Sequence, residues 1–118
     1  MIYTNILKEK NFAVIGDTIH ENKYAYKIKQ KLLKNNYTVY SVGKELTSLN
    51  DIQDPIDVID LCIHPSKGLK LLQENRKPFK YLIIQPGADS PELFAWLHAN
   101  QISFIQGCIL VALQKEKK

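Results

Sequence analysis

The stretch Phe12-Ala13-Val14-Ile15-Gly16-Asp17-Thr18 decides the fold, because an apolar run ends there in a glycine and a polar turn. A helical pattern over Tyr24–Asn35 follows it. A buried strand, a turn and a helix in this order are typical of the first unit of a doubly wound α/β domain. We therefore predict the first strand over Phe12–Ile15, with the turn leading into the first helix.

This turn has two interpretations. A glycine lets a ligand approach the backbone, and a helix start offers unpaired N–H groups and a partial positive charge, so phosphate could bind where Gly16-Asp17-Thr18 meets the helix. The turn nevertheless has one glycine, not the three of G-x-G-x-x-G, and no P-loop lysine follows. From these residues alone, a nucleotide site and a plain strand-to-helix turn both remain open.

The rest of the chain repeats the alternation of strand and helix. Further strands are predicted at Tyr37–Val42, Val58–Ile63, Tyr81–Ile84 and Ile102–Ile105. Helical or mixed segments are predicted at Ile2–Leu7 (a short helix or a cover), Thr47–Pro55 (a loop with one helical turn), 65–75, 89–100 and Ile109–Leu113 (strand or helix). The alternation predicts a parallel sheet with right-handed crossovers. We expect one Rossmann-like α/β domain over residues 1–118, with five strands in the order 3-2-1-4-5, helices on both faces and a frayed tail at 114–118.

Composition excludes several classes of protein. The chain has 118 residues, of which 45% are hydrophobic, enough for one domain with a real core. No apolar run is long enough to span a membrane, and the N-terminus does not resemble a secretory signal. Cys62 and Cys108 lie far apart, and the histidines form no metal-ligand pair. We expect free thiols, no metal site, no membrane partner and a cytoplasmic location.

The net charge of +4 at pH 7 is partly carried by the first helix. At 100° per residue, Tyr24, Ala25, Ile28, Leu32 and Leu33 gather on its inner side. Lys23, Lys27 and Lys34 cluster on the opposite side, which is interpreted as a solvated face more readily than as a binding patch. Aromatic residues are not interleaved with the lysines, so nucleic acid is not expected as a partner.

Taken together, the four turns that follow the strands resemble those of the small stand-alone CoA-binding domain proteins, which are similar to the CoA-binding domain of the succinyl-CoA synthetase alpha chain. The similarity extends from about Phe12 to Cys108. It is carried by Ile15-Gly16-Asp17-Thr18, Tyr26, Asn36-Tyr37, Asp57, Asp60, Pro65, Gln85-Pro86-Gly87 and Cys108. The chain departs from the family at Ser41-Val42-Gly43-Lys44, where relatives have Pro-Val-Asn-Pro, and at Ile63 and His64, where relatives often carry basic residues.

The resemblance implies a protein that binds coenzyme A or an acyl-CoA at the carboxyl ends of its strands, without catalysis of its own. Gly16, Asp17 and Thr18 would then contact the pyrophosphate. Lys44, in the turn Val42-Gly43-Lys44, would meet a phosphate, with Lys67 as a second source of charge. The implied remaining contacts are Ile63, His64 and Pro65 beside the adenosine and Gln85, Pro86 and Gly87 beside the pantetheine.

Two other functions stay open. An NAD(P)-binding accessory subunit or oxidoreductase fragment would need an acidic residue at the end of the second strand to reach the ribose, whereas Glu45 stands one step late. A protein-interaction module that has lost its nucleotide ligand is the third reading, supported by the altered turn at Ser41–Lys44.

Overall fold

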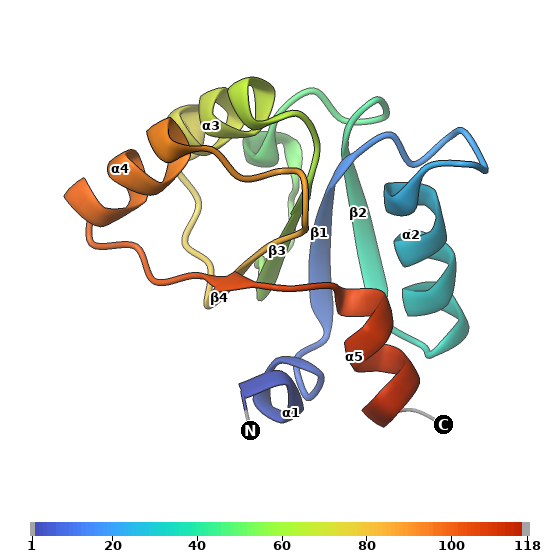
Figure 1. The fold of residues 1–118 in the computed structure, drawn as a ribbon. Coiled ribbons are helices and arrows are strands. Elements are labelled where there is room, and N and C mark those ends of the chain that lie inside the picture. The colour runs from blue at the N-terminus through green and yellow to red at the C-terminus, as the bar shows by residue number, and fades with distance from the viewer. Residues whose placement is uncertain (1, 117–118) are drawn as a thin grey trace.

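The computed structural model describes residues 2–116, and they form a sheet with helices on both of its faces (Figure 1). The strands are β1 (Asn11–Gly16), β2 (Thr38–Gly43), β3 (Val58–Cys62), β4 (Tyr81–Ile84) and β5 (Ile105–Gln106). The helices are α1 (Ile2–Ile6), α2 (Tyr24–Lys34), the 3-10 turn η1 (Leu49–Asp51), α3 (Pro65–Glu74), α4 (Pro91–Ala99) and α5 (Ile109–Glu116). Every pair of neighbouring strands is parallel, which confirms the predicted α/β class.

The predicted strand order 3-2-1-4-5 is wrong, because the sheet has the order β2-β1-β3-β4-β5. The reason lies in the burial of the strands. Val58 to Leu61 of β3 are all buried, whereas the first three residues of β2 are half-buried. An apolar strand of this kind belongs inside a sheet, and the more polar β2 lies at the edge. The strand order therefore reverses at β1, because β2 lies on one side of β1 and β3 lies on the other.

Each face of the sheet has its own apolar layer. On one face, Leu72 of α3 and Leu93 and Leu97 of α4 pack against alternate residues of the strands. On the other, Ile28 of α2 and Leu113 of α5 pack with residues of α1 and of the strands. The two-residue period of a strand sends successive side chains to these two layers.

Fewer side chains of α2 are buried against the sheet than the sequence predicted. Ala25, Ile28 and Leu32 are buried, but Tyr24 is 64% exposed and Leu33 is 45% exposed. At 100° per residue these two side chains lie roughly 70–110° to either side of the buried ones. They therefore flank the contact with the sheet.

Two predictions change near the C-terminus. Ile102 closes the turn that follows α4, because its N–H donates to the Leu97 carbonyl (2.9 Å) after Gln101 adopts a φ of 56°, and β5 starts only at Ile105. The segment from Ile109 is a helix that continues to Glu116, so residues 114–116 are helical where a frayed tail was expected. Residues 117–118 lie outside the described part of the chain.

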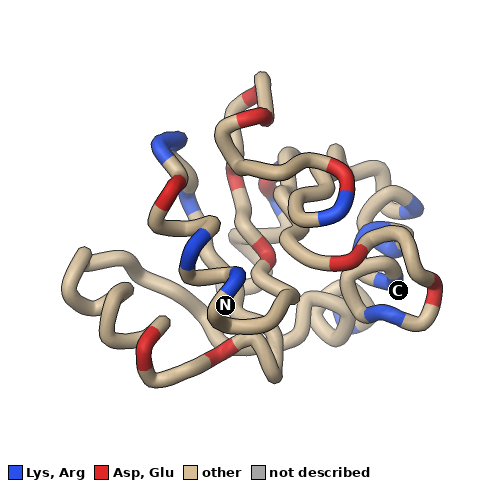
Figure 2. The backbone as a smooth tube through the Cα atoms, turned by 90° about the horizontal axis from the view of Figure 1, so that it is seen from above, with Lys and Arg blue, Asp and Glu red and all other residues tan. Residues whose placement is uncertain are grey.

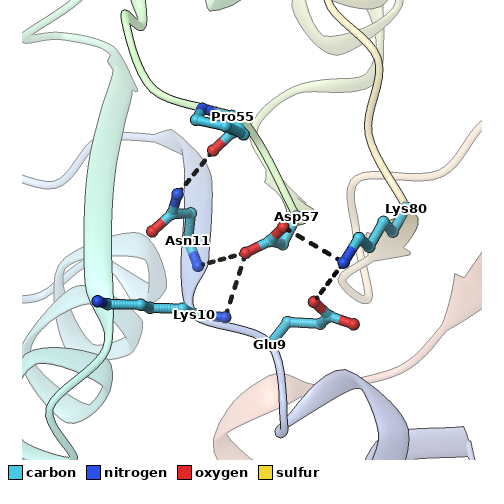
Figure 3. Close-up of polar contacts among 6 residues, drawn as sticks. All are labelled: Glu9, Lys10, Asn11, Pro55, Asp57 and Lys80. Carbon is cyan, nitrogen blue, oxygen red and sulfur yellow. Dashed lines mark hydrogen bonds and ion pairs between the residues drawn. The ribbon is translucent and has the colours of Figure 1, made fainter.

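Asp57 ties three strands together at the amino ends of the sheet (Figure 3). Its Oδ2 accepts hydrogen bonds from the backbone N–H groups of Asn11 (2.9 Å) and Lys10 (3.2 Å). Lys80, just before β4, places its Nζ 2.9 Å from Glu9 Oε1 and 3.8 Å from Asp57 Oδ1. These contacts hold the sheet at the end opposite to the cavity described next.

Candidate functional site: a cavity at the carboxyl ends of the strands

A cavity of about 480 Å³ lies at the carboxyl ends of β1 and β3, where the strand order reverses. In open α/β sheets this crossing point is where ligands bind. The cavity is lined by Gly16, Asp17, Lys23, Tyr24, Ala25, Gly43, Lys44, Cys62, Ile63, His64, Lys67, Pro86, Gly87 and Ala88. Eight of the twelve predicted site residues are therefore brought together: Gly16, Asp17, Gly43, Lys44, Ile63, His64, Pro86 and Gly87.

Gly16, at the end of β1, lines the cavity. It pairs with Gly43 of β2 on one side and with Cys62 of β3 on the other. A Cβ at position 16 would lie 2.3 Å from the Cys62 carbonyl oxygen and 2.9 Å from the Ala25 Cβ. Helix α2 can approach the sheet closely only because this side chain is missing. A larger residue here would displace the sheet itself as well as fill the cavity.

The start of α2 opens onto the cavity without a side-chain cap. Lys23 occupies the N-cap position, and its ammonium group cannot accept a hydrogen bond from the helix N–H groups. The first turn contains no acidic residue. The starts of α3 and α4 differ, because His64 and Ser90 cap them. The unpaired N–H groups and partial positive charge of α2 are thus available to an anion.

Three lysines add positive charge around this helix start. Lys23, Lys44 and Lys67 line the cavity, and none of them forms an ion pair within residues 2–116. Lys44 lies in a closed turn, since the Gly43 N–H donates to the Leu46 carbonyl (2.6 Å) and the Leu46 N–H to the Ser41 carbonyl (2.9 Å). The charge of Lys44 is therefore held close to the cavity by an ordered backbone.

Asp17 organises the loop after β1. Its Oδ1 accepts from the N–H groups of Ile19 (3.0 Å) and His20 (3.1 Å), and its Oδ2 lies 2.7 Å from His20 Nδ1. Burial opposes ionisation, but these hydrogen bonds and the nearby imidazole outweigh it and lower the pKa of Asp17 to about 2. The Asp17 carboxylate thus occupies loop amides that a phosphate would otherwise contact.

Thr18 does not line the cavity. Its hydroxyl donates to Glu45 Oε2 (2.7 Å), which also accepts from Lys29 Nζ at 2.9 Å. The lysine and the hydroxyl together lower the pKa of Glu45 to about 2. Thr18, Glu45 and Lys29 thereby join the β1–α2 loop, the turn after β2 and α2.

The segment after β3 divides between cavity and helix. Ile63 and His64 line the cavity, whereas Pro65 begins α3 and lies outside the lining. His64 Nδ1 accepts from the Ser66 N–H (3.3 Å) and lies 2.9 Å from Ser66 Oγ. One ring nitrogen of His64 is therefore engaged at the start of α3.

Gln85 is placed away from the cavity. It is 3% exposed, and its Oε1 accepts from the Ile109 N–H (2.8 Å) at the start of α5. Because β3 lies between β1 and β4, the end of β4 is one strand further from the crossing point than the predicted order implied. Pro86 and Gly87 still reach the cavity, whereas Val42 is buried beneath it.

Some lining residues were absent from the sequence prediction, namely Lys23, Tyr24, Ala25, Cys62 and Ala88. Lys23, Tyr24 and Ala25 belong to the start of α2, so the reasoning that placed phosphate at this helix start could have named them. Cys62 pairs with Gly16, which only the strand order reveals. Burial, and then the nearby Asp60 and Cys108, raise the pKa of the Cys62 thiol to about 12. Cys62 and Cys108 are free, as predicted.

Within residues 2–116, no group of three histidine, cysteine or acidic side chains is arranged to hold a metal ion. The same residues contain no helix with the length and apolar character needed to cross a membrane.

The fold and the cavity define a small doubly wound domain whose crossing point is open to an anionic ligand. The chain belongs to the CoA binding domain family, whose sequence pattern matches residues 10–114. A conserved hypothetical protein from Pyrococcus furiosus is similar at 28% identity with a TM-score of 0.78, covering 87% of this chain and 98% of its own.

Two other solved structures share the fold. A protein from Thermus thermophilus is 21% identical with a TM-score of 0.77, covering 97% of this chain and 95% of its own. A protein redesigned for binding is 20% identical with a TM-score of 0.81, covering 97% of this chain and 88% of its own. Comparison with curated proteins gives no match.

Proposed function

We propose that this protein binds coenzyme A or an acyl-CoA in the cavity between the ends of β1 and β3, without catalysis of its own. The observation that carries the proposal is the uncapped start of α2, which faces the same cavity as Gly16 and the lysines Lys23, Lys44 and Lys67. CoA carries a pyrophosphate and a phosphomonoester, and its phosphates match a site with this charge. Membership of the CoA binding domain family supports coenzyme A as the ligand.

Most of the predicted contacts keep their roles in this proposal. The pyrophosphate lies over Gly16 and the first N–H groups of α2. Lys44 and Lys67 meet phosphate oxygens as point charges. The side chains of Thr18 and Gln85 hold the fold around the cavity, since Glu45 and the start of α5 already occupy them.

The chemistry of the lining favours binding over catalysis. Asp17 is engaged by loop amides, one nitrogen of His64 is engaged by Ser66, and the thiol of Cys62 has a pKa of about 12. A general base or nucleophile would need a free group whose pKa is near the working pH. Glu45, the acidic residue nearest to the position that would bind the ribose of NAD, is held by Lys29 and Thr18, which favours CoA over NAD.

Titration calorimetry with CoA, acetyl-CoA, dephospho-CoA and NAD tests the proposal. We expect CoA to bind wild type, and Lys44→Ala to weaken it about ten- to a hundredfold, because a charged hydrogen bond contributes roughly 1.5–3 kcal/mol. The loss should shrink as salt rises. If Lys44 contacts the phosphomonoester, dephospho-CoA should bind wild type and Lys44→Ala with nearly equal affinity. If Lys44 contacts the pyrophosphate, the substitution should weaken CoA and dephospho-CoA by the same factor.

The control is Lys8→Ala, which removes the same charge from an exposed position after α1. It should leave the Kd for CoA within about twofold, because no direct contact is lost. Equal binding by wild type and Lys44→Ala would remove Lys44 from the site. Failure of wild type to bind any of the four nucleotides at millimolar concentration would overturn the proposal in favour of an interaction module.

A further inference from the structure

The outer face of α2 carries a row of lysines that form no ion pair with any other described residue. Lys23, Lys27, Lys31 and Lys34 follow one another at intervals of four, four and three residues. At 100° per residue they fall within an arc of about 80°, so they form one stripe along the helix. We call these four residues the lysine stripe. In Figure 2, several positive positions lie on the side of the molecule where α2 lies, and others lie on the opposite side.

The lysine stripe differs from an ordinary solvated helix face. Exposed helices commonly mix both signs of charge at intervals of three or four residues, because like charges at that spacing repel. Helix α3 follows this pattern, with Glu74 four residues after Lys70, whereas α2 contains no acidic residue. Its remaining lysine, Lys29, points elsewhere and pairs with Glu45. Within residues 2–116, no stripe member forms an ion pair.

A groove runs beside the lysine stripe between α2 and α5. Lys27, Lys31 and Lys34 line one side of it, and Leu110 and Gln114 of α5 line the other. Two apolar side chains of α2 are exposed, Tyr24 at 64% and Leu33 at 45%, and Tyr26 of the same helix lines the groove. Lys27 Nζ lies 5.5 Å from the centre of the Tyr24 ring. The surface therefore offers positive charge together with apolar contacts.

The lysine stripe also begins at the mouth of the cavity. Lys23 and Tyr24 line the candidate CoA cavity, and the later lysines lead away from it along α2. A macromolecule lying on the stripe would be next to the opening through which the proposed ligand enters.

We propose that the lysine stripe and the groove between α2 and α5 dock an acidic, amphipathic helix of a partner protein that delivers or receives the ligand of the neighbouring cavity. The docking itself follows from charge complementarity and the apolar residues, and its link to ligand transfer rests on the proposed function. From Lys23 to Lys34 the stripe is about 16 Å long at 1.5 Å per residue, which matches three turns of a helix with carboxylates at the same spacing. It contains no arginine, and apolar side chains accompany it, which favours a protein over nucleic acid.

Fluorescence anisotropy with a labelled model peptide tests this proposal. The probe is an amphipathic helical peptide with glutamates at intervals of four, four and three residues, compared with a scrambled peptide of equal composition and a duplex oligonucleotide. The triple variant Lys27→Glu, Lys31→Glu, Lys34→Glu leaves the cavity lining intact, since it excludes Lys23. We expect the triple variant to bind the helical peptide at least thirtyfold more weakly at physiological salt, because three charge-complementary contacts become repulsive.

A matched variant separates the stripe from net charge. Lys8→Glu with Lys10→Glu and Lys70→Glu changes the net charge equally but spares the stripe, and we expect a loss below threefold for the peptide. Backbone amide signals of α2 and α5 should shift on titration with the peptide, and those of α4 should not. Equal losses in the two variants, or a scrambled peptide or oligonucleotide binding as tightly as the helical peptide, would overturn the proposal.

CoA titration of the stripe variant distinguishes this inference from the proposed function. The variant should keep the wild-type Kd for CoA while losing the peptide. Loss of both, in a protein whose unfolding free energy is unchanged, would mean that the lysines act on the cavity and not on a partner. A wild type that binds the peptide but not CoA would leave the docking surface in place and remove only the proposed link to ligand transfer.

Discussion

Asp60 is the residue whose environment departs furthest from what its side chain prefers. It lies in β3 between Val14 of β1 and Ile83 of β4, and it is completely buried. Neither of its carboxylate oxygens has a hydrogen-bond partner within residues 2–116, and the buried hydroxyl of Tyr3 also has none. Burial raises the pKa of Asp60 to about 8. The side chain is therefore held as a neutral acid at neutral pH.

This burial makes the stability of the fold depend on pH. The pKa of an unfolded aspartate is about 3.9, so between pH 4 and 8 the folded state retains a proton that the unfolded state has already lost. The contribution of Asp60 to stability is full below about pH 4 and is lost as the pH rises through 8. We expect wild type to lose up to about 1.4 kcal/mol per pH unit in this window, and Asp60→Asn to lack that slope.

Urea unfolding at pH 5, 6, 7 and 8 measures this effect. The difference between wild type and Asp60→Asn isolates Asp60, because every other side chain is common to both proteins. Glu92→Gln, which alters an exposed carboxylate on α4, should keep the wild-type slope. Parallel pH profiles of wild type and Asp60→Asn would contradict the buried neutral acid.

At the scale of elements, the start of α2, which faces the cavity, differs from the starts of α3, α4 and α5, which are capped. His64, Ser90 and Gln85 satisfy the starts of α3, α4 and α5, whereas the start of α2 faces the cavity without a side-chain cap. The resemblance placed Gln85 beside the ligand, whereas its amide oxygen is buried against Ile109. Which of these roles Gln85 has is open to direct measurement.

Gln85→Leu should lower the free energy of unfolding by about 1–3 kcal/mol, because the buried N–H of Ile109 loses its acceptor. The Kd for CoA should stay within about twofold, since Gln85 does not line the cavity. Ser90→Ala, which removes the cap of α4, serves as a comparison with a similar loss of stability. A tenfold weaker affinity in Gln85→Leu alone would return this side chain to the ligand site.

At the scale of the whole molecule, the two ends of the sheet have different roles. The amino ends are joined by Asp57 and its contacts with Lys10, Asn11 and Lys80 (Figure 3). At the carboxyl ends, Gly16 and Gly43 are paired and the turns that follow the strands line the cavity. Stability and binding should therefore respond to different substitutions.

Asp57→Ala tests this division. It should lower the free energy of unfolding by about 1–3 kcal/mol, because two backbone N–H groups lose a charged acceptor. It should leave the Kd for CoA unchanged within about twofold. Lys80→Ala should cost less stability, since this lysine is 60% exposed and its ion pairs are solvated. A large loss of CoA affinity in Asp57→Ala would show that the two ends of the sheet are coupled.

The sequence by itself determined the class of fold, because the alternation of apolar strands with helical patterns admits little else. It also determined the turn at Gly16, since only a glycine at the end of a buried strand allows a helix to start so close to the sheet. The alternation of strands and helices also made the positions of Gly16 and of the four turns predictable. Eight of the predicted site residues line one cavity.

Only the tertiary structure decided which of these residues face the cavity. The strand order placed β3 beside β1, which brought Cys62 and His64 to the crossing point and moved the Gln85 side chain to α5. The partner of Thr18 likewise comes from a distant turn, and Asp60 is buried without a hydrogen-bond partner among residues 2–116, which no local pattern specifies. Local periodicity indicates whether a side chain points to the inside or the outside of the fold. The direction of a buried polar group depends instead on long-range packing. For this physical reason the site could be predicted as a region and not residue by residue.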